Sequence, residues 1–158
     1  MIFESLPTTP RSEELLDKAF SRAARAGRAK SGLEAQQSML QTASSILSDN
    51  LENVVTQWPD FGTVDPFYYE LADAIVDVDE LRQSLSRVTW TSRQISELRR
   101  EYQPKLRNTD ADTARKHRKQ AFARMADLVE DVADDLKRIG EARDALKTLP
   151  DIRPDEPA

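Results

Sequence analysis

The chain has 158 residues, a formal net charge of −5, one histidine and no cysteine. Its length suits one domain with a hydrophobic core. Without cysteine it forms neither a disulfide framework nor a thiolate zinc site, and His117 alone cannot build an imidazole metal cluster. Only 4 glycines and 6% aromatic residues favour helix over sheet. We therefore expect a single all-α domain.

The first predicted helix covers about residues 9–26. Thr9-Pro10 is a typical helix start, because threonine caps free amides and proline suits the first helical position. Stepping 100° per residue separates an apolar face from a basic face. The basic face carries Lys18, Arg22 and Arg25. Gly27 and Gly32 then bracket a predicted break.

A second amphipathic helix is predicted over residues 33–58, because apolar residues recur at helical spacing until Pro59 forbids continuation. Asp65-Pro66 predicts the next helix start. Residues 77–80 have the pattern of a capping box, so we expect a break or kink there. These signals divide the middle of the chain into separate helices.

Two long helices, at about residues 79–103 and 111–148, are predicted to form an antiparallel hairpin within a helical bundle. Pro104 ends the first, and the second keeps its apolar residues on a 3.5-residue repeat. The bundle domain is expected to span residues 1–149. Residues 150–158 are rich in proline and acids, which predicts a stiff, solvated linker.

Positive charge is concentrated in two segments of an otherwise acidic chain. Residues 18–30 hold five bases and no acid, and residues 99–124 hold nine bases against three acids. Such helix ends can bind phosphate, because arginine forms bidentate hydrogen bonds and each neutralised phosphate releases counterions. The candidate RNA-binding residues are Lys18, Arg22, Arg25, Arg28, Lys30, Arg99, Arg100, Lys105, Arg107, Arg115, Lys116, Arg118, Lys119 and Arg124. The alternative is a solvated face whose bases pair with acids such as Glu97 and Glu101.

Other candidate groups favour structural roles. Arg118 falls inside the apolar stripe of its helix, which predicts that the core fades at that end. The acidic residues of the last predicted helix are expected to form a solvated face; they are Asp127, Glu130, Asp131, Asp134 and Asp135. The aromatic residues are expected to pack in the core; they are Trp58, Trp90, Phe67, Tyr68 and Tyr69. No phosphate-binding glycine loop and no nucleophile with a nearby base occur in the sequence. We assign no catalytic, cofactor-binding or metal-binding residue.

The N-terminus lacks a basic region followed by an apolar stretch, and no run of about 18 apolar residues occurs. Neither a signal peptide nor a membrane span is therefore expected, and the predicted location is cytoplasmic.

Three segments carry a resemblance that covers essentially the whole chain. They are residues 7–25 (PTTPRSEELLDKAFSRAAR), 65–88 (DPFYYELADAIVDVDELRQSLSRV) and 115–154 (RKHRKQAFARMADLVEDVADDLKRIGEARDALKTLPDIRP). Together they resemble the N-terminal helical domain of the nucleolar GTP-binding protein 1 family, in an archaeal form. That family comprises Obg-related GTPases of ribosome assembly. Its helical domain is followed directly by a strand and a phosphate-binding loop, before which this chain stops at Ala158.

The resemblance implies a non-catalytic domain that docks on large-subunit ribosomal RNA near the maturing catalytic centre. It also implies that GTP and Mg belong to a GTPase domain absent from this chain, so no cofactor is expected here. The alternative function is a protein-interaction module that binds its own GTPase domain or another assembly factor. Carried over by segment, the RNA candidates are Lys18, Arg22, Arg25, Arg115, Lys116, Arg118, Lys119 and Arg124.

Overall fold

The computed structural model describes residues 3–149, and every regular element within this range is a helix. This confirms the all-α prediction; the linker predicted at residues 150–158 lies outside the described part of the chain. None of these helices is long and apolar enough to cross a membrane. The elements are α1 (Ser12–Arg28), α2 (Gly32–Thr56), α3 (Pro66–Asp73), α4 (Val78–Tyr102), the 3₁₀ helix η1 (Pro104–Leu106), α5 (Ala111–Asp131) and α6 (Ala133–Leu146).

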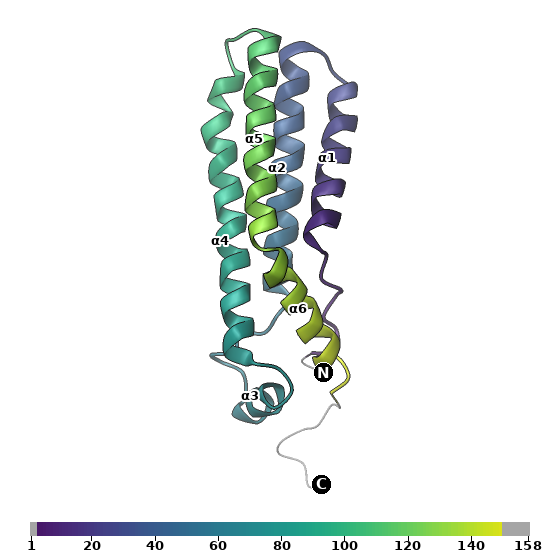
Figure 1. Ribbon diagram of the computed structural model, residues 1–158, viewed down its shortest axis with the longest axis vertical. Helices are drawn as coiled ribbons and strands as arrows, with labels where there is room; N and C mark the ends of the chain where they lie inside the picture. Colours follow the sequence, from purple (N-terminus) through teal and green to yellow (C-terminus); the bar gives the residue numbers. More distant parts are fainter. Residues whose placement is uncertain (1–2, 150–158) are drawn as a thin grey trace.

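Four helices, α1, α2, α4 and α5, run along the long axis of the molecule and form a bundle (Figure 1). The most extensive packing joins α1 with α2 and α2 with α4, while α5 packs against both α2 and α4. The α1–α2 turn and the α4–α5 turn both lie at the upper end in Figure 1, whereas α3 and α6 lie at the other end. The two basic segments of the sequence therefore converge on one end of the bundle.

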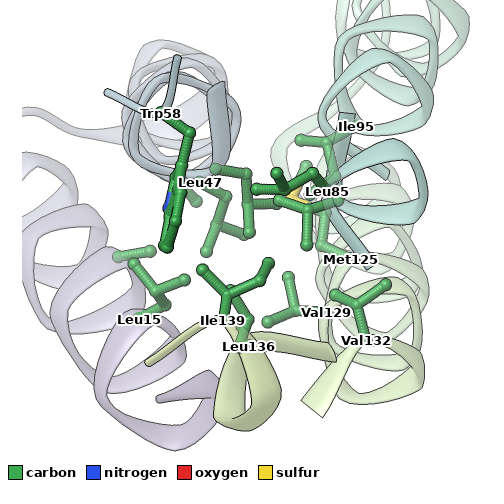
Figure 2. Packing of buried hydrophobic residues seen from close by; sticks show 14 of the residues in the cluster. Leu15, Leu47, Trp58, Leu85, Ile95, Met125, Val129, Val132, Leu136 and Ile139 are labelled. Atoms are coloured by element: carbon green, nitrogen blue, oxygen red, sulfur yellow. The ribbon is translucent and has the colours of Figure 1, made fainter. Parts of the chain in front are cut away.

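The core fills the space between the helices with aliphatic side chains. Leu47 of α2, Ile95 of α4 and Met125 of α5 are all fully buried. Figure 2 shows Leu136 and Ile139 of α6 pointing into the same cluster, which closes the core at that end. Burial of a leucine or isoleucine side chain stabilises a fold by about 1.5–3 kcal/mol relative to exposure.

Aspartate side chains cap three of the helices. Asp65 Oδ1 accepts a hydrogen bond from Phe67 N at 2.8 Å, which confirms the predicted start of α3. Asp77 Oδ1 accepts from Glu80 N at 3.0 Å, so the predicted break before α4 is also confirmed. Asp110 Oδ1 accepts from Thr113 N at 2.6 Å and caps α5. Each carboxylate satisfies an amide that has no partner within its helix.

The predicted start of the first helix is two residues early. Helix α1 begins at Ser12, after Arg11, whose side chain forms no capping hydrogen bond. The residues before it pack against α6 instead, because Arg143 Nε donates to the carbonyl oxygen of Leu6 at 2.9 Å. These tertiary contacts override the helix-start signal of Thr9-Pro10.

The two glycines near the first turn have different roles. Gly27 lies inside α1, not at the predicted break, and a Cβ there would come within 2.7 Å of Met39 Sδ on α2. Gly27 thus permits close approach of the two helices. Gly32 has a φ of +59°, a conformation that glycine adopts without the steric cost of a Cβ. The break is confined to residues 29–31.

The predicted long helix at residues 111–148 is wrong, because the chain bends at Val132, where φ is −106° and ψ is 17°. The predicted hairpin is therefore formed by α4 with two successive helices, α5 and α6, which both pack against α4. Apolar residues continue at helical spacing through the bend, since Val129, Val132 and Leu136 are all buried. The apolar pattern consequently gives no signal of the change in direction that turns α6 toward the N-terminal residues (Figure 1).

Candidate nucleic-acid interface

The two basic segments meet around the α1–α2 turn and η1. Gln37 Nε2 of α2 donates to the carbonyl oxygen of Leu106 in η1 at 2.8 Å, and this hydrogen bond holds η1 against α2. We call this part of the molecule the basic end and define it as residues 25–34 and 104–119. The basic end holds nine bases and three acids, so it is strongly positive although the chain as a whole carries a net negative charge.

Six of the predicted binding residues are exposed and unpaired. Their side chains form no hydrogen bond or ion pair with any residue between Phe3 and Leu149, and they come from α1, α5 and the segment between η1 and α5. They are Arg22, Arg25, Arg28, Arg107, Lys116 and Lys119. Their charges are free to meet a polyanion without first breaking an internal contact.

Four other candidates form exposed ion pairs with acids, which is the arrangement that the solvated-face alternative predicts. The pairs are Lys30–Glu34 at 3.5 Å, Arg115–Asp112 at 3.5 Å, Arg124–Glu101 at 3.0 Å and Arg100–Glu97. Exposed pairs of this kind contribute only about 0–1 kcal/mol, so a phosphate can compete for the bases. Hydrogen bonds to Tyr102 and Glu101 also raise the pKa of Arg124.

Arg118 is held by the fold. Its Nε donates to Gln36 Oε1 on α2 at 2.9 Å, and its guanidinium lies 5.0 Å from the ring centroid of Phe122. Phe122 in turn stacks on Phe20 of α1, with 4.7 Å between ring centroids. Burial lowers the pKa of Arg118, and the charge of Arg115 acts in the same direction. Arg118 therefore links three helices at the basic end.

The expectation that the core fades beside Arg118 is wrong. Leu106, Ala114 and Ala121 are all fully buried, so apolar packing continues to the basic end. The guanidinium is tolerated there because it has a hydrogen-bond acceptor and an aromatic ring beside it. The sequence pattern placed Arg118 on the correct face but gave no sign of its partner Gln36.

Each of the last three candidates lies beside a polar or aromatic side chain. Arg99 is half-buried between α4 and α2, with NH1 3.4 Å from Ser45 Oγ. Lys105 Nζ lies 4.8 Å from the ring centroid of Tyr102. Lys18 lies within α1, outside the basic end, and its Nζ is 3.5 Å from Asn50 Oδ1 of α2. Arg99 is therefore structural, whereas the two lysines remain exposed to solvent.

Two structural expectations outside the basic end need correction. Asp135, expected on a solvated face, is buried and accepts hydrogen bonds from Ser84 and Arg87 of α4. Trp58 is in the core as predicted, but Trp90 and Phe67 are exposed. The described residues contain no group of three His, Cys, Asp or Glu side chains that could hold a metal ion.

Comparison with known proteins agrees with the helical architecture. A family model described as the NOG1 N-terminal helical domain matches residues 3–153. An uncharacterised protein of Methanocaldococcus jannaschii is 26% identical over 161 residues, which cover 96% of this chain and 46% of that protein. Nucleolar GTP-binding protein 1 of Drosophila melanogaster is 25% identical over 107 residues, 67% of this chain and 16% of that protein. The chain thus spans less than half the length of these relatives.

Proposed function

Because this chain belongs to the family of the NOG1 N-terminal helical domain, we propose that its basic end docks on folded ribosomal RNA of the large subunit. The domain would be the RNA-docking part of a GTP-binding assembly factor. The observation that carries this proposal is the gathering of unpaired bases from two distant segments at one end of the bundle.

The shape of the molecule supports end-on docking. Helix α4 has 25 residues, which corresponds to a length of about 37 Å. The unpaired bases Arg28, Arg107 and Lys116 lie near one end of the elongated bundle. The bundle can therefore enter a recess in folded RNA with this basic end first. Phosphate contacts would supply most of the affinity, and the shape of the RNA would supply the selectivity.

The docking function requires no chemistry from this domain. In the proposal, GTP and Mg bind in another part of a longer protein, and the bundle positions that part on its RNA target. The relative named as a GTP-binding protein is about four times as long as this chain, which is compatible with such a division.

Charge reversal at the basic end tests the proposal. Arg25→Glu, Arg28→Glu, Lys116→Glu and Lys119→Glu are combined in one variant, and its affinity for a large-subunit ribosomal RNA fragment is measured by fluorescence anisotropy at fixed salt. We expect a loss of at least tenfold, since four favourable charges become repulsive. The helical content of each variant is checked by circular dichroism.

The matched control reverses two arginines and two lysines that are exposed and lie away from the basic end. These are Arg11, Arg82, Lys137 and Lys147. The total charge of the two variants is identical, so net charge alone cannot separate them. An equal loss of affinity in both variants would contradict docking through the basic end.

A second function, as a protein-interaction module, is favoured by exposed apolar side chains. Trp90 of α4 is 56% exposed, and Phe67 and Ile75 are also exposed. Exposed apolar groups gain from burial against a partner, such as a GTPase domain or another assembly factor. Co-purification that survives high salt and nuclease, and that Trp90→Ala abolishes, would support this function over RNA docking.

A further inference from the structure

A groove of about 710 Å³ opens at the basic end, between the α1–α2 turn and η1. Its volume falls within the range of about 300–1,000 Å³ that is typical of small-molecule sites. Ala26 of α1 and Ala29, which follows α1, contribute apolar surface to its lining, while Leu40 and Leu106 are buried beneath it. Such a surface is suited to contact the face of a planar ring.

Three glutamine side chains line the same groove. Gln37 Nε2 donates to the carbonyl oxygen of Leu106, and Gln103 Nε2 donates to Gln41 Oε1 at 3.3 Å. Oε1 of Gln37 and Oε1 of Gln103 accept no hydrogen bond from the part of the chain that the structure describes. These oxygens can accept hydrogen bonds from the N–H groups that nucleobases carry on their Watson–Crick edges.

Two cations line the groove beside the amides. Arg107 has no side-chain partner among residues 3–149, and Lys30 is held only by Glu34, at 3.5 Å. Both can reach the phosphates on either side of a base that enters the groove. The combination of apolar surface, amide acceptors and flanking cations matches the three chemical parts of a nucleotide.

From this arrangement we infer that the groove binds one unpaired nucleotide, extruded from the RNA on which the basic end docks. The inference rests on the proposed RNA-docking function and adds a specific contact to it. The base lies among the amides of Gln37 and Gln103, and its phosphates lie beside Arg107 and Lys30. A base within a duplex cannot enter, because its Watson–Crick edge is already paired.

Two RNA hairpins test the inference on the full 158-residue chain. One has a continuous paired stem, and the other carries a single-nucleotide bulge in the same stem. The groove variant combines Gln103→Ala, which removes a proposed acceptor for the base, with Gln41→Ala, which removes the side chain that orients Gln103. Gln37 stays in place because it holds η1. The control variant combines Gln57→Ala with Gln83→Ala, two exposed glutamines outside the groove.

We expect the unchanged chain and the control variant to bind the bulged hairpin several-fold more tightly than the paired one. The groove variant should lose this preference while its affinity for the paired hairpin stays the same. Equal binding of the two hairpins by the unchanged chain, or a preference that persists in the groove variant, would overturn the groove site and leave RNA docking standing. If the unchanged chain binds neither of the two hairpins nor the ribosomal RNA fragment, the proposed function is overturned as well.

Discussion

Asp135 at the start of α6 accepts a hydrogen bond from Ser84 Oγ on α4 at 2.8 Å, and both residues are buried. The same carboxylate oxygen accepts from Arg87 Nε at 2.9 Å and lies 3.4 Å from Arg138 NH1. Arg138 Nε also pairs with Glu80 of α4 at 2.8 Å. This network joins α6 to α4 immediately after the bend at Val132.

Removal of this carboxylate should therefore destabilise the fold. Asp135→Ala leaves Ser84 and two guanidinium groups without their shared acceptor, and we expect a loss of about 2–3 kcal/mol in the free energy of unfolding. Urea denaturation measures it. Asp127→Ala, at an exposed position of α5, should change the stability by less than about 0.5 kcal/mol. Similar stability of the two variants would show that the network does not hold α6.

Arg118 should contribute to stability more than its exposed neighbour does. Arg118→Ala removes the hydrogen bond to buried Gln36 and the contact with Phe122, at an expected cost of about 1–2 kcal/mol. Lys119→Ala removes the same charge without these contacts and should cost less than about 0.5 kcal/mol. Thermal unfolding of the two variants compares them directly, and an equal midpoint would contradict the structural role of Arg118.

Local signals in the sequence were sufficient where local chemistry decides the structure. Asp65 and Asp77 cap helices as predicted, because a cap depends on residues three or fewer positions away. The bend at Val132 was missed because the apolar repeat continues through it. The network around Asp135 that joins α6 to α4 pairs residues about fifty positions apart.

The candidate site was predicted in part for the same reason. Charge counts located both basic segments, but their convergence depends on the way the bundle folds. The partner of Arg118 is Gln36, which is 82 positions away and gives no charge signal. The groove was not predicted, since the glutamines that line it are spread over α2 and the end of α4.

The cap of α5 should make stability depend on acidic pH. Hydrogen bonds from Thr113 lower the pKa of Asp110 below its ordinary value of 3.8. The stabilisation is fully present above that value and is lost as the pH falls through the lower pKa of the folded state. NMR titration should show this pKa below 3.8.

Two variants separate the charge of Asp110 from its capping geometry. Asp110→Ala should lower the midpoint of thermal unfolding at neutral pH, because the amide of Thr113 loses its acceptor. Asp110→Asn should retain most of the stability and lose the acid dependence of this group. A midpoint unchanged by Asp110→Ala would contradict a capping role.

The positive φ of Gly32 should make this position sensitive to any side chain. Gly32→Ala is expected to cost about 1 kcal/mol, although no atom lies within 4 Å of the position that the new Cβ would occupy. The cost arises from the backbone conformation and not from a clash. Gly32→Asn should cost less, since asparagine tolerates a positive φ better, and a smaller cost for alanine would contradict this explanation.

The salt dependence of RNA binding tests the central claim most directly. Each phosphate neutralised by a base contributes about 0.7–0.9 to the slope of log affinity against log salt concentration. If about five bases engage phosphate, the slope for the unchanged chain should be about −4. Replacement of Arg25, Arg28, Lys116 and Lys119 by glutamine should reduce its magnitude by about 3, whereas glutamine at Arg11, Arg82, Lys137 and Lys147 should leave it unchanged. A slope that is the same in both variants would contradict docking through the basic end.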